Sequence, residues 1–310
     1  MEFSRWRRSR SWAYSAQFSL NDGLKEHGVQ CFTINTMCLP VIKNLCEGKK
    51  FDQVWLEIVH QPLDKELLEW IAQLAPVRLG FAGESLEYSE ADYQGFSGLR
   101  ELKENAISML PYLTHVMLVD EKDVYDFGKR KDLETMWWIA SIPKNFIASE
   151  INNSSSPFAA FAGTIYSKRA KWLEIDELKT ALVKQVSSEA NTLYPAFYNA
   201  LQFSMFHGSK IIDMHDGKIF KKYQQYWLSL RKICFERWLQ KMQLTCASVN
   251  LPSAVKAYAG RVCEAMSAGV PVLSWKIPER PQNEALFEHG KEILYFIFYK
   301  SHYVIMKNSS

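Results

Sequence analysis

The sequence has little of what marks several large protein classes. Its six cysteines form no CxxC pair and have no histidine at ligand spacing, which argues against a metal site or a disulfide framework. No apolar run reaches 18 residues, and the basic start is not followed by an apolar core. We therefore expect neither a transmembrane helix nor a signal peptide, and we predict a cytoplasmic protein with no bound metal.

Several nucleotide-binding and catalytic motifs are also missing. No GxGxxG or GxxxxGK[ST] sequence follows a predicted strand, which weakens the dinucleotide-binding and P-loop interpretations. There is no GxSxG elbow and no HExxH pair. The reaction, if there is one, must therefore rest on a less common pattern of residues.

The net charge is small, +3 over 310 residues. This argues against a dedicated nucleic-acid-binding protein, whose basic face usually makes the domain far more positive. A nucleic-acid role would have to use Lys168, Arg169 and Lys171 with the aromatic residues Trp227 and Trp238. We predict no nucleic-acid partner.

The amino terminus combines arginines with tryptophans and could touch a membrane surface. A solvated terminus explains the same composition. The residues concerned are Trp6, Arg7, Arg8, Arg10 and Trp12.

Strand-length apolar runs alternate with longer amphipathic runs, a pattern typical of parallel sheets with crossover helices. Strands are predicted at 29–35, 51–59, 77–83, 114–120, 158–163, 244–250, 270–275 and 292–298. Helices are predicted at 16–26, 64–75, 99–113, 170–186, 218–242, 260–269 and 284–290.

A polar stretch, Asn152 to Pro157, separates two such alternations. At 310 residues, the chain is also long enough for two domains. We predict two doubly wound, Rossmann-like α/β domains, residues 1–150 and 151–310, facing each other across a cleft with a hinge at 145–157. Ligands of such sheets bind outside the carboxyl ends of the strands.

The most informative segment runs from Val249 to Tyr295. A strand ends at Asn250, and a helix begins at Gly260, so unpaired amides and the positive end of a helix dipole can hold a diphosphate. Lys256 and Arg261 add positive charge, and Glu264 could accept hydrogen bonds from two vicinal ribose hydroxyls. An ordinary helix–turn–strand unit with a solvated glutamate is the alternative.

Two motifs carry a resemblance to a known family. The first is Arg261-x-x-Glu264-Ala-Met-x-Ala-Gly-x-Pro-Val, and the second is Phe161-x-Gly163-x-x-Tyr166-x-x-Arg169. Together they resemble the donor-binding half of GT-B glycosyltransferases of the family 4, "glycosyl transferases group 1" type, closest to the CgeB-like branch. They cover about a fifth of the chain, all of it in the carboxyl-terminal half.

The resemblance implies a glycosyltransferase that moves a sugar from a nucleoside-diphosphate donor, UDP- or GDP-linked, to a glycan, lipid or protein acceptor. Glu264 would bind the ribose, and Gly260, Arg261 and Arg169 would surround the diphosphate beside Gly163. These fixed donors would replace a metal ion, so we expect no metal and no other cofactor. Residues 1–150 would hold the acceptor.

Some features depart from the family. Lys256 stands where many family members have a first glutamate, and the chain ends about one strand after Tyr295, so the carboxyl-terminal domain is expected to be truncated. Both features leave open a degenerate nucleotide-binding protein or a fragment. No catalytic base is assigned, although His60 and Asp120, at the ends of two predicted strands, are candidates. A retaining mechanism needs no base, because the leaving phosphate oxygen can take the acceptor proton.

Overall fold

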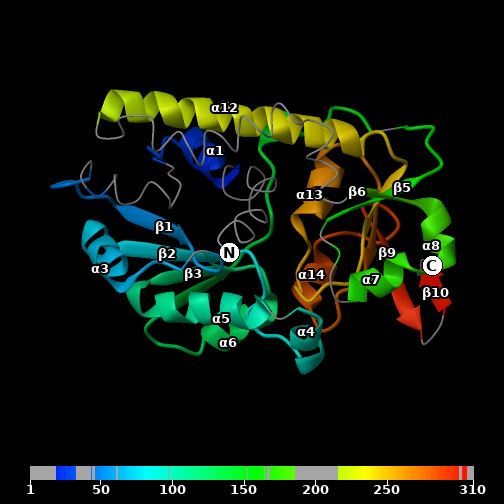
Figure 1. Cartoon of the computed structure of the whole chain (residues 1–310), viewed down its shortest axis with the longest axis horizontal. Coiled ribbons are helices and arrows are strands. Elements are labelled where there is room, and N and C mark those ends of the chain that lie inside the picture. Colours follow the sequence, from blue (N-terminus) through cyan, green and yellow to red (C-terminus); the bar gives the residue numbers. More distant parts are fainter. Residues whose placement is uncertain are drawn as a thin grey trace.

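A computed structural model of the chain describes residues 19–32, 43, 46–60, 62–96, 98–151, 153–163, 165, 168–185, 216–299 and 302–305. It is a mixed α/β structure with two mainly parallel sheets, one from each half of the sequence (Figure 1). The predicted α/β class with two parallel sheets is confirmed. The arrangement is compatible with two Rossmann-like domains.

The first sheet contains four parallel strands in the order β1-β2-β3-β4. These are β1 (Gln53–Glu57), β2 (Val77–Ala82), β3 (His115–Leu118) and β4 (Glu134–Trp137). Parallel strands need crossover connections, which α3 (Lys65–Leu74), α4 (Glu90–Gly95), α5 (Gly98–Met109) and α6 (Glu121–Phe127) provide here.

Helix α3 shows why the local sequence specifies these elements. The Asp64 side chain accepts a hydrogen bond from the amide of Leu67, so it caps the helix that was predicted at 64–75. Leu68, Ile71 and Leu74, spaced three residues apart, are buried against the first sheet and its neighbours.

The second sheet has six strands in the order β10-β9-β8-β7-β5-β6. They are β5 (Ala159–Ala162), β6 (Leu182–Gln185), β7 (Ala247–Asn250), β8 (Val272–Trp275), β9 (Leu294–Tyr299) and β10 (His302–Ile305). Five strands are parallel, and β10 is antiparallel to β9. The chain passes from β5 to β6 on one side and returns to β7 on the other, so the winding reverses between β5 and β7.

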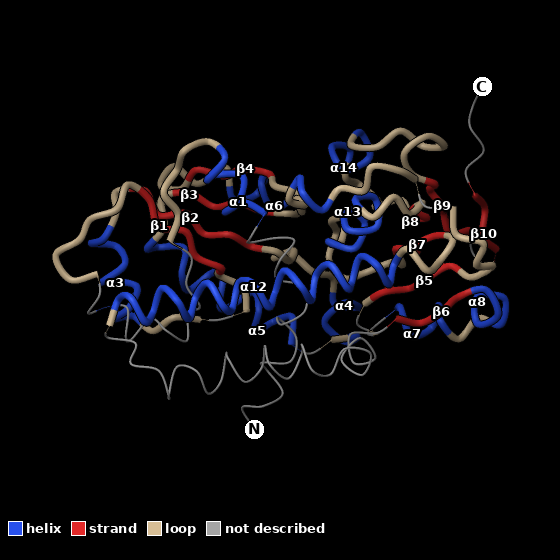
Figure 2. The backbone as a smooth tube through the Cα atoms, turned by 90° about the horizontal axis from the view of Figure 1, so that it is seen from above, coloured by secondary structure: helices blue, strands red, loops and turns tan. Residues whose placement is uncertain are grey.

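The helices of the second half include α7 (Lys168–Leu173), α8 (Asp176–Ala181), α13 (Gly260–Ser267) and α14 (Pro281–Ala285). The longest is α12 (Gly217–Met242), which lies along both sheets (Figures 1 and 2). Near its start, Phe220 and Tyr223 pack with Cys46 and Leu74 of the first half. Its last three turns bury their apolar side chains in the core of the second half. One helix therefore contributes to the cores of both halves.

The predicted division at residues 150 and 151 falls between β4 and β5, the last and first strands of the two sheets. Because α12 packs on both halves, their independence as domains stays a prediction.

Near the amino terminus, helix α1 (Ser19–Glu26) ends with a turn at Gly28, whose φ of 79° suits glycine.

Several predicted elements were wrong in detail. The helix predicted at 170–186 is instead α7, α8 and strand β6, because residues 182–185 pair with β5. The strand predicted at 292–298 is not the last, since β10 covers what would otherwise be the edge formed by β9. Strand β4 was not predicted. Residues 29–32 form no strand, and residues 33–35 lie outside the described part.

Candidate functional site

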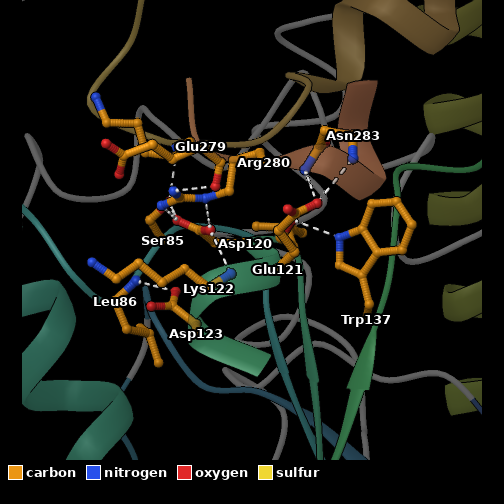
Figure 3. A network of polar contacts seen from close by, with 12 residues as sticks. Ser85, Leu86, Asp120, Glu121, Lys122, Asp123, Trp137, Glu279, Arg280 and Asn283 are labelled. Carbon is orange, nitrogen blue, oxygen red and sulfur yellow. Dashed lines mark hydrogen bonds and ion pairs between the residues drawn. The ribbon is translucent and has the colours of Figure 1, made fainter. Parts of the chain in front are cut away.

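The carboxyl ends of the two sheets face each other. The amide of Lys256, in the loop after β7, donates to Ser85 Oγ, in the loop after β2, over 2.8 Å. Ser85 Oγ donates to Asp120, which follows β3, and Arg280, which follows β8, binds the same carboxylate (Figure 3). Loops from four strand ends therefore meet at one interface, the place where ligands of doubly wound sheets bind.

An apolar cluster extends this interface. Ala257, from the loop after β7, is buried against side chains of β2, of β3 and of the segments that follow β3 and β4. The cluster consists of Leu79, Phe81, Met117, Val119, Trp138 and Ala257. The loop from β7 to α13 is thus packed on the first half of the molecule by apolar contacts as well as by the Lys256 amide.

Three of the predicted donor residues come together where β5 ends. Gly163 directly follows β5 and has a φ of 154°, and a Cβ atom at this position would collide with the guanidinium of Arg261. The guanidinium carbons of Arg261 and Arg169 lie 5.4 and 5.8 Å from the ring centroid of Phe161. The sequence motifs, almost 100 residues apart, therefore converge on one aromatic ring.

Arg261 is held in place from several sides. Its Nη1 donates to Asn250 Oδ1, at the end of β7, over 3.1 Å, and Asn250 Nδ2 donates to Ser274 Oγ on β8. Arg261 and Arg169 are both buried. Their two positive charges therefore lie beside Phe161 in the interior rather than on an exposed surface, and that of Arg261 also lies against Gly163.

The position of this cluster in the second sheet, more than its burial, indicates a binding site. Gly163 and Arg169 follow β5, whereas Arg261 follows β7, so the cluster lies at the point where the winding reverses. Gly260 opens α13, and its N-cap residue, Ala259, supplies no side-chain acceptor. A helix start, a glycine turn and two guanidinium groups at a switch point are suited to binding an anion.

Glu264 lies one turn further along α13 and faces α12. Its Oε2 accepts a hydrogen bond of 2.9 Å from Nε1 of Trp238, and the residue is only 1% exposed. Arg261 and Glu264 therefore have different neighbours in this structure, and the carboxylate is enclosed between two helices. The alternative of a solvated glutamate on an ordinary helix does not describe this position.

His60 lies just past β1 between two carboxylates. Its Nδ1 is 3.0 Å from Glu57 Oε1, and its Nε2 is 3.6 Å from Glu84 Oε1. Burial lowers the pKa of His60, but the hydrogen bonds and charges of the two glutamates outweigh it and raise the pKa to about 10. The imidazole is then protonated at neutral pH, which suits a hydrogen-bond donor rather than a general base.

Asp120, the other candidate base, is fully buried and caps α6 by accepting from the amide of Lys122. Arg280 contacts both of its oxygens, through Nε at 2.5 Å and Nη2 at 3.0 Å. Asp120 is therefore committed to an ion pair across the interface. Its partner, 160 positions later in the chain, was not predicted, because no local pattern links the two.

Lys256 does not point its charge at the predicted donor cluster. Its Nζ donates to the carbonyl oxygen of Ser253 over 3.1 Å, lies 4.0 Å from Asp92 Oδ2, and sits over the ring of Trp275. The Lys256 side chain thus contributes a cation to the interface, close to Asp92 of the first half.

Within the described residues, no group of three His, Cys, Asp or Glu side chains is arranged to hold a metal ion. None of the described helices is both long and apolar enough to cross a bilayer. The arginine–tryptophan segment at residues 6–12 lies outside the described part, so its predicted membrane contact stays a prediction. In comparisons with known proteins, no protein-family model matches the chain and no curated protein matches it.

Proposed function

We propose that the protein is a glycosyltransferase of the GT-B type that uses a nucleoside-diphosphate sugar as donor. The observation that carries the proposal is the cluster of Gly163, Arg169 and Arg261 at the switch point of the second sheet. The carboxyl ends of the first sheet lie opposite. A donor bound at the cluster would therefore present its sugar to a second substrate held by the first half.

The chemistry would follow from this placement. The diphosphate would lie at the glycine turn and the start of α13, where Arg169 and Arg261 supply positive charge. During transfer, the bond from the anomeric carbon to the phosphate oxygen breaks, and a bond to the acceptor oxygen forms. The acceptor proton passes to the leaving phosphate, and fixed positive groups stabilise the charge that develops there. The His60 imidazolium would lie on the acceptor side, with its two N–H groups directed at Glu57 and Glu84.

A second candidate is a nucleotide-binding protein of the same type that has lost turnover. The contacts of Lys256 favour it, because this residue replaces a carboxylate of the resembled family with a cation engaged by Ser253 and Asp92. Binding and turnover separate the two candidates. Release of UDP or GDP from a nucleotide sugar supports the enzyme, whereas tight binding without release supports the degenerate protein.

Arg261→Met tests the donor site, because methionine fills much of the same volume without the charge. We expect the affinity for UDP or GDP, measured by isothermal titration calorimetry, to fall about 10-fold or more, since a charged hydrogen bond contributes about 1.5–3 kcal/mol. Arg237→Met, at an exposed position of α12, is the matched control and should bind as the parent does.

Failure of the parent to bind any nucleoside diphosphate would refute the proposal. Unchanged affinity in a folded Arg261→Met variant would instead place the diphosphate elsewhere. Circular dichroism and thermal unfolding establish whether the variant is folded before its affinity is interpreted.

A further inference from the structure

The first turn of α6 holds the second half of the molecule through two neighbouring carboxylates. Asp120 binds Arg280, and Glu121 Oε2 accepts from the backbone amide and the side-chain Nδ2 of Asn283, at 2.9 and 3.4 Å. All four residues are less than a tenth exposed. With the hydrogen bond from Lys256 to Ser85, these contacts form what we call the latch, made of Ser85, Asp120, Glu121, Lys256, Arg280 and Asn283. Figure 3 labels all of these residues except Lys256.

A third carboxylate, Asp123, lies beside the latch without joining it. It is fully buried, and its Oδ2 accepts from the amide of Leu86 over 2.7 Å. Its Oδ1 has no hydrogen-bond partner among the residues that the structure describes. A buried carboxylate oxygen without a donor favours the neutral form of the acid, since desolvation penalises only the charged form.

The charged groups around Asp123 come from each element packed against it. Asp120 lies on the same turn, Glu87 follows β2, Lys103 is on α5, and Arg280 belongs to the second half. Burial, followed by the nearby charge of Asp120, raises the pKa of Asp123 to about 7. Figure 3 shows Asp120 and Asp123 on one turn of α6, below Arg280 in that view.

We propose that the latch is pH-sensitive, and that a proton on Asp123 holds the two halves of the molecule together. With Asp123 protonated, Arg280 faces the carboxylates of Asp120 and Glu121. After Asp123 ionises, a third buried carboxylate is added, and it repels that of Asp120. Separation of the two halves then exposes the carboxylates of Asp120 and Asp123 to water. The proposal is independent of any enzymatic activity.

The direction of the effect follows from proton linkage. The closed form binds this proton up to about pH 7, whereas a hydrated aspartate holds it only near its ordinary pKa of 3.8. Between these values, the closed form carries more protons, so raising the pH favours opening. From pH 6 to pH 8, this single proton shifts the opening equilibrium by about 10-fold.

Hydrogen exchange of two backbone amides gives a direct test on the full chain. The amides of Lys256 and Asn283 donate across the interface, to Ser85 and Glu121. The amide of Lys276 donates to Phe296 within the second half and is the internal control. We expect the protection factors of the first two amides, corrected for intrinsic exchange, to fall about 10-fold from pH 6 to pH 8. That of Lys276 should stay constant.

Two variants make the test specific. Asp123→Asn keeps the acceptor for Leu86 but cannot ionise, so its protection factors at Lys256 and Asn283 should not change with pH. Arg280→Met removes the cation and should lower protection at both pH values. A parent protein with constant protection overturns the proposal, and so does an Asp123→Asn variant with the same pH response as the parent. If Asp123→Asn does not fold, constant protection of the parent between pH 6 and pH 8 still overturns the proposal.

Discussion

Glu264 is a residue whose burial changes what its substitution should do. The sequence left open a solvated glutamate at this position, but the structure encloses Glu264 against Trp238. Glu264→Gln keeps an oxygen acceptor for the indole N–H, so its melting temperature should remain close to that of the parent. Glu264→Ala leaves that buried donor without its acceptor and should cost about 1–3 kcal/mol of unfolding free energy.

The same two variants test the proposed ribose contact. Both should weaken UDP or GDP binding about 10-fold or more, and the parent should bind the 2′-deoxyribose nucleotide with a similar loss. The control is Glu236→Gln, at an exposed acid on α12. This variant should bind UDP or GDP as the parent does and should keep the parent's preference for ribose over deoxyribose nucleotides. Equal affinity of the parent for ribose and deoxyribose nucleotides would show that Glu264 does not bind the ribose hydroxyls.

Gly163 and Arg261 show which part of the candidate site could be predicted from the sequence. Their place in two motifs predicted a shared site, and the structure packs the glycine on the guanidinium. The burial of both arginines on Phe161 was not predicted. Exposure depends on the three-dimensional neighbours of a side chain, and a motif specifies residue types without those neighbours.

Among the elements, α12 makes the least expected contribution. Its length was predicted from a long helical pattern, but its contact with both cores was not. A helix of 26 residues spans about 39 Å at 1.5 Å per residue, enough to reach across two small sheets. Phe220 packs in the first half and Phe235 in the second. The helix therefore couples the stability of the two halves.

Ser229→Pro tests this coupling. Ser229 is exposed near the middle of α12, and its hydroxyl donates to the carbonyl oxygen of Gln225. Proline removes a backbone hydrogen bond and clashes with that carbonyl, at a cost of about 3 kcal/mol or more. We expect a lower melting temperature and two unfolding steps in calorimetry, one for each half. Ser229→Ala removes only the hydroxyl and should unfold as the parent does; a single unchanged transition in Ser229→Pro would show that α12 does not link the halves.

The pattern of elements could be predicted wherever local periodicity decides the structure. The helix predicted at 64–75 is confirmed as α3, because its cap at Asp64 and its apolar face are set by residues within the one helix. Strand β6 could not be predicted, because its sequence continues a helical pattern and its structure depends on pairing with β5, some 20 residues earlier. Tertiary pairing outweighs local propensity at such edges.

For the whole molecule, the hydrogen bonds and the ion pair of the latch join residues more than 150 positions apart. Asp120 and Arg280 are each ordinary in their own segments, an aspartate before a helix and an arginine before a proline. No local sequence pattern links Asp120 with Arg280. The sequence therefore predicts a cleft between the halves, but it does not predict the ion pair that joins the halves there. The same limit applies to Ser85 and Lys256, which are joined across the interface by one hydrogen bond.

The ion pair between Asp120 and Arg280 should contribute more to stability than surface pairs do, because both partners are buried. Breaking a buried pair by removing one partner costs about 3–5 kcal/mol, since it leaves a charge without compensation. Asp120→Asn is the suitable partner variant, because asparagine can still cap α6. Arg280→Met and Asp120→Asn should each lower the unfolding free energy in urea. The double variant should lose less than the sum of the two, by 1 kcal/mol or more, as estimated for residues in direct contact.

The exposed pair of Arg130 and Asp132 provides the comparison. Its Arg130→Met variant should leave the unfolding free energy close to that of the parent, because solvent screens such pairs. The measurements belong at pH 6, below the pKa of about 7 of Asp123, so that this carboxyl group beside the latch stays mostly protonated. Additive losses in the double variant, within about 0.5 kcal/mol, would mean that the two residues are not coupled. The halves would then be held together by the apolar cluster around Ala257 and by α12, rather than by the latch.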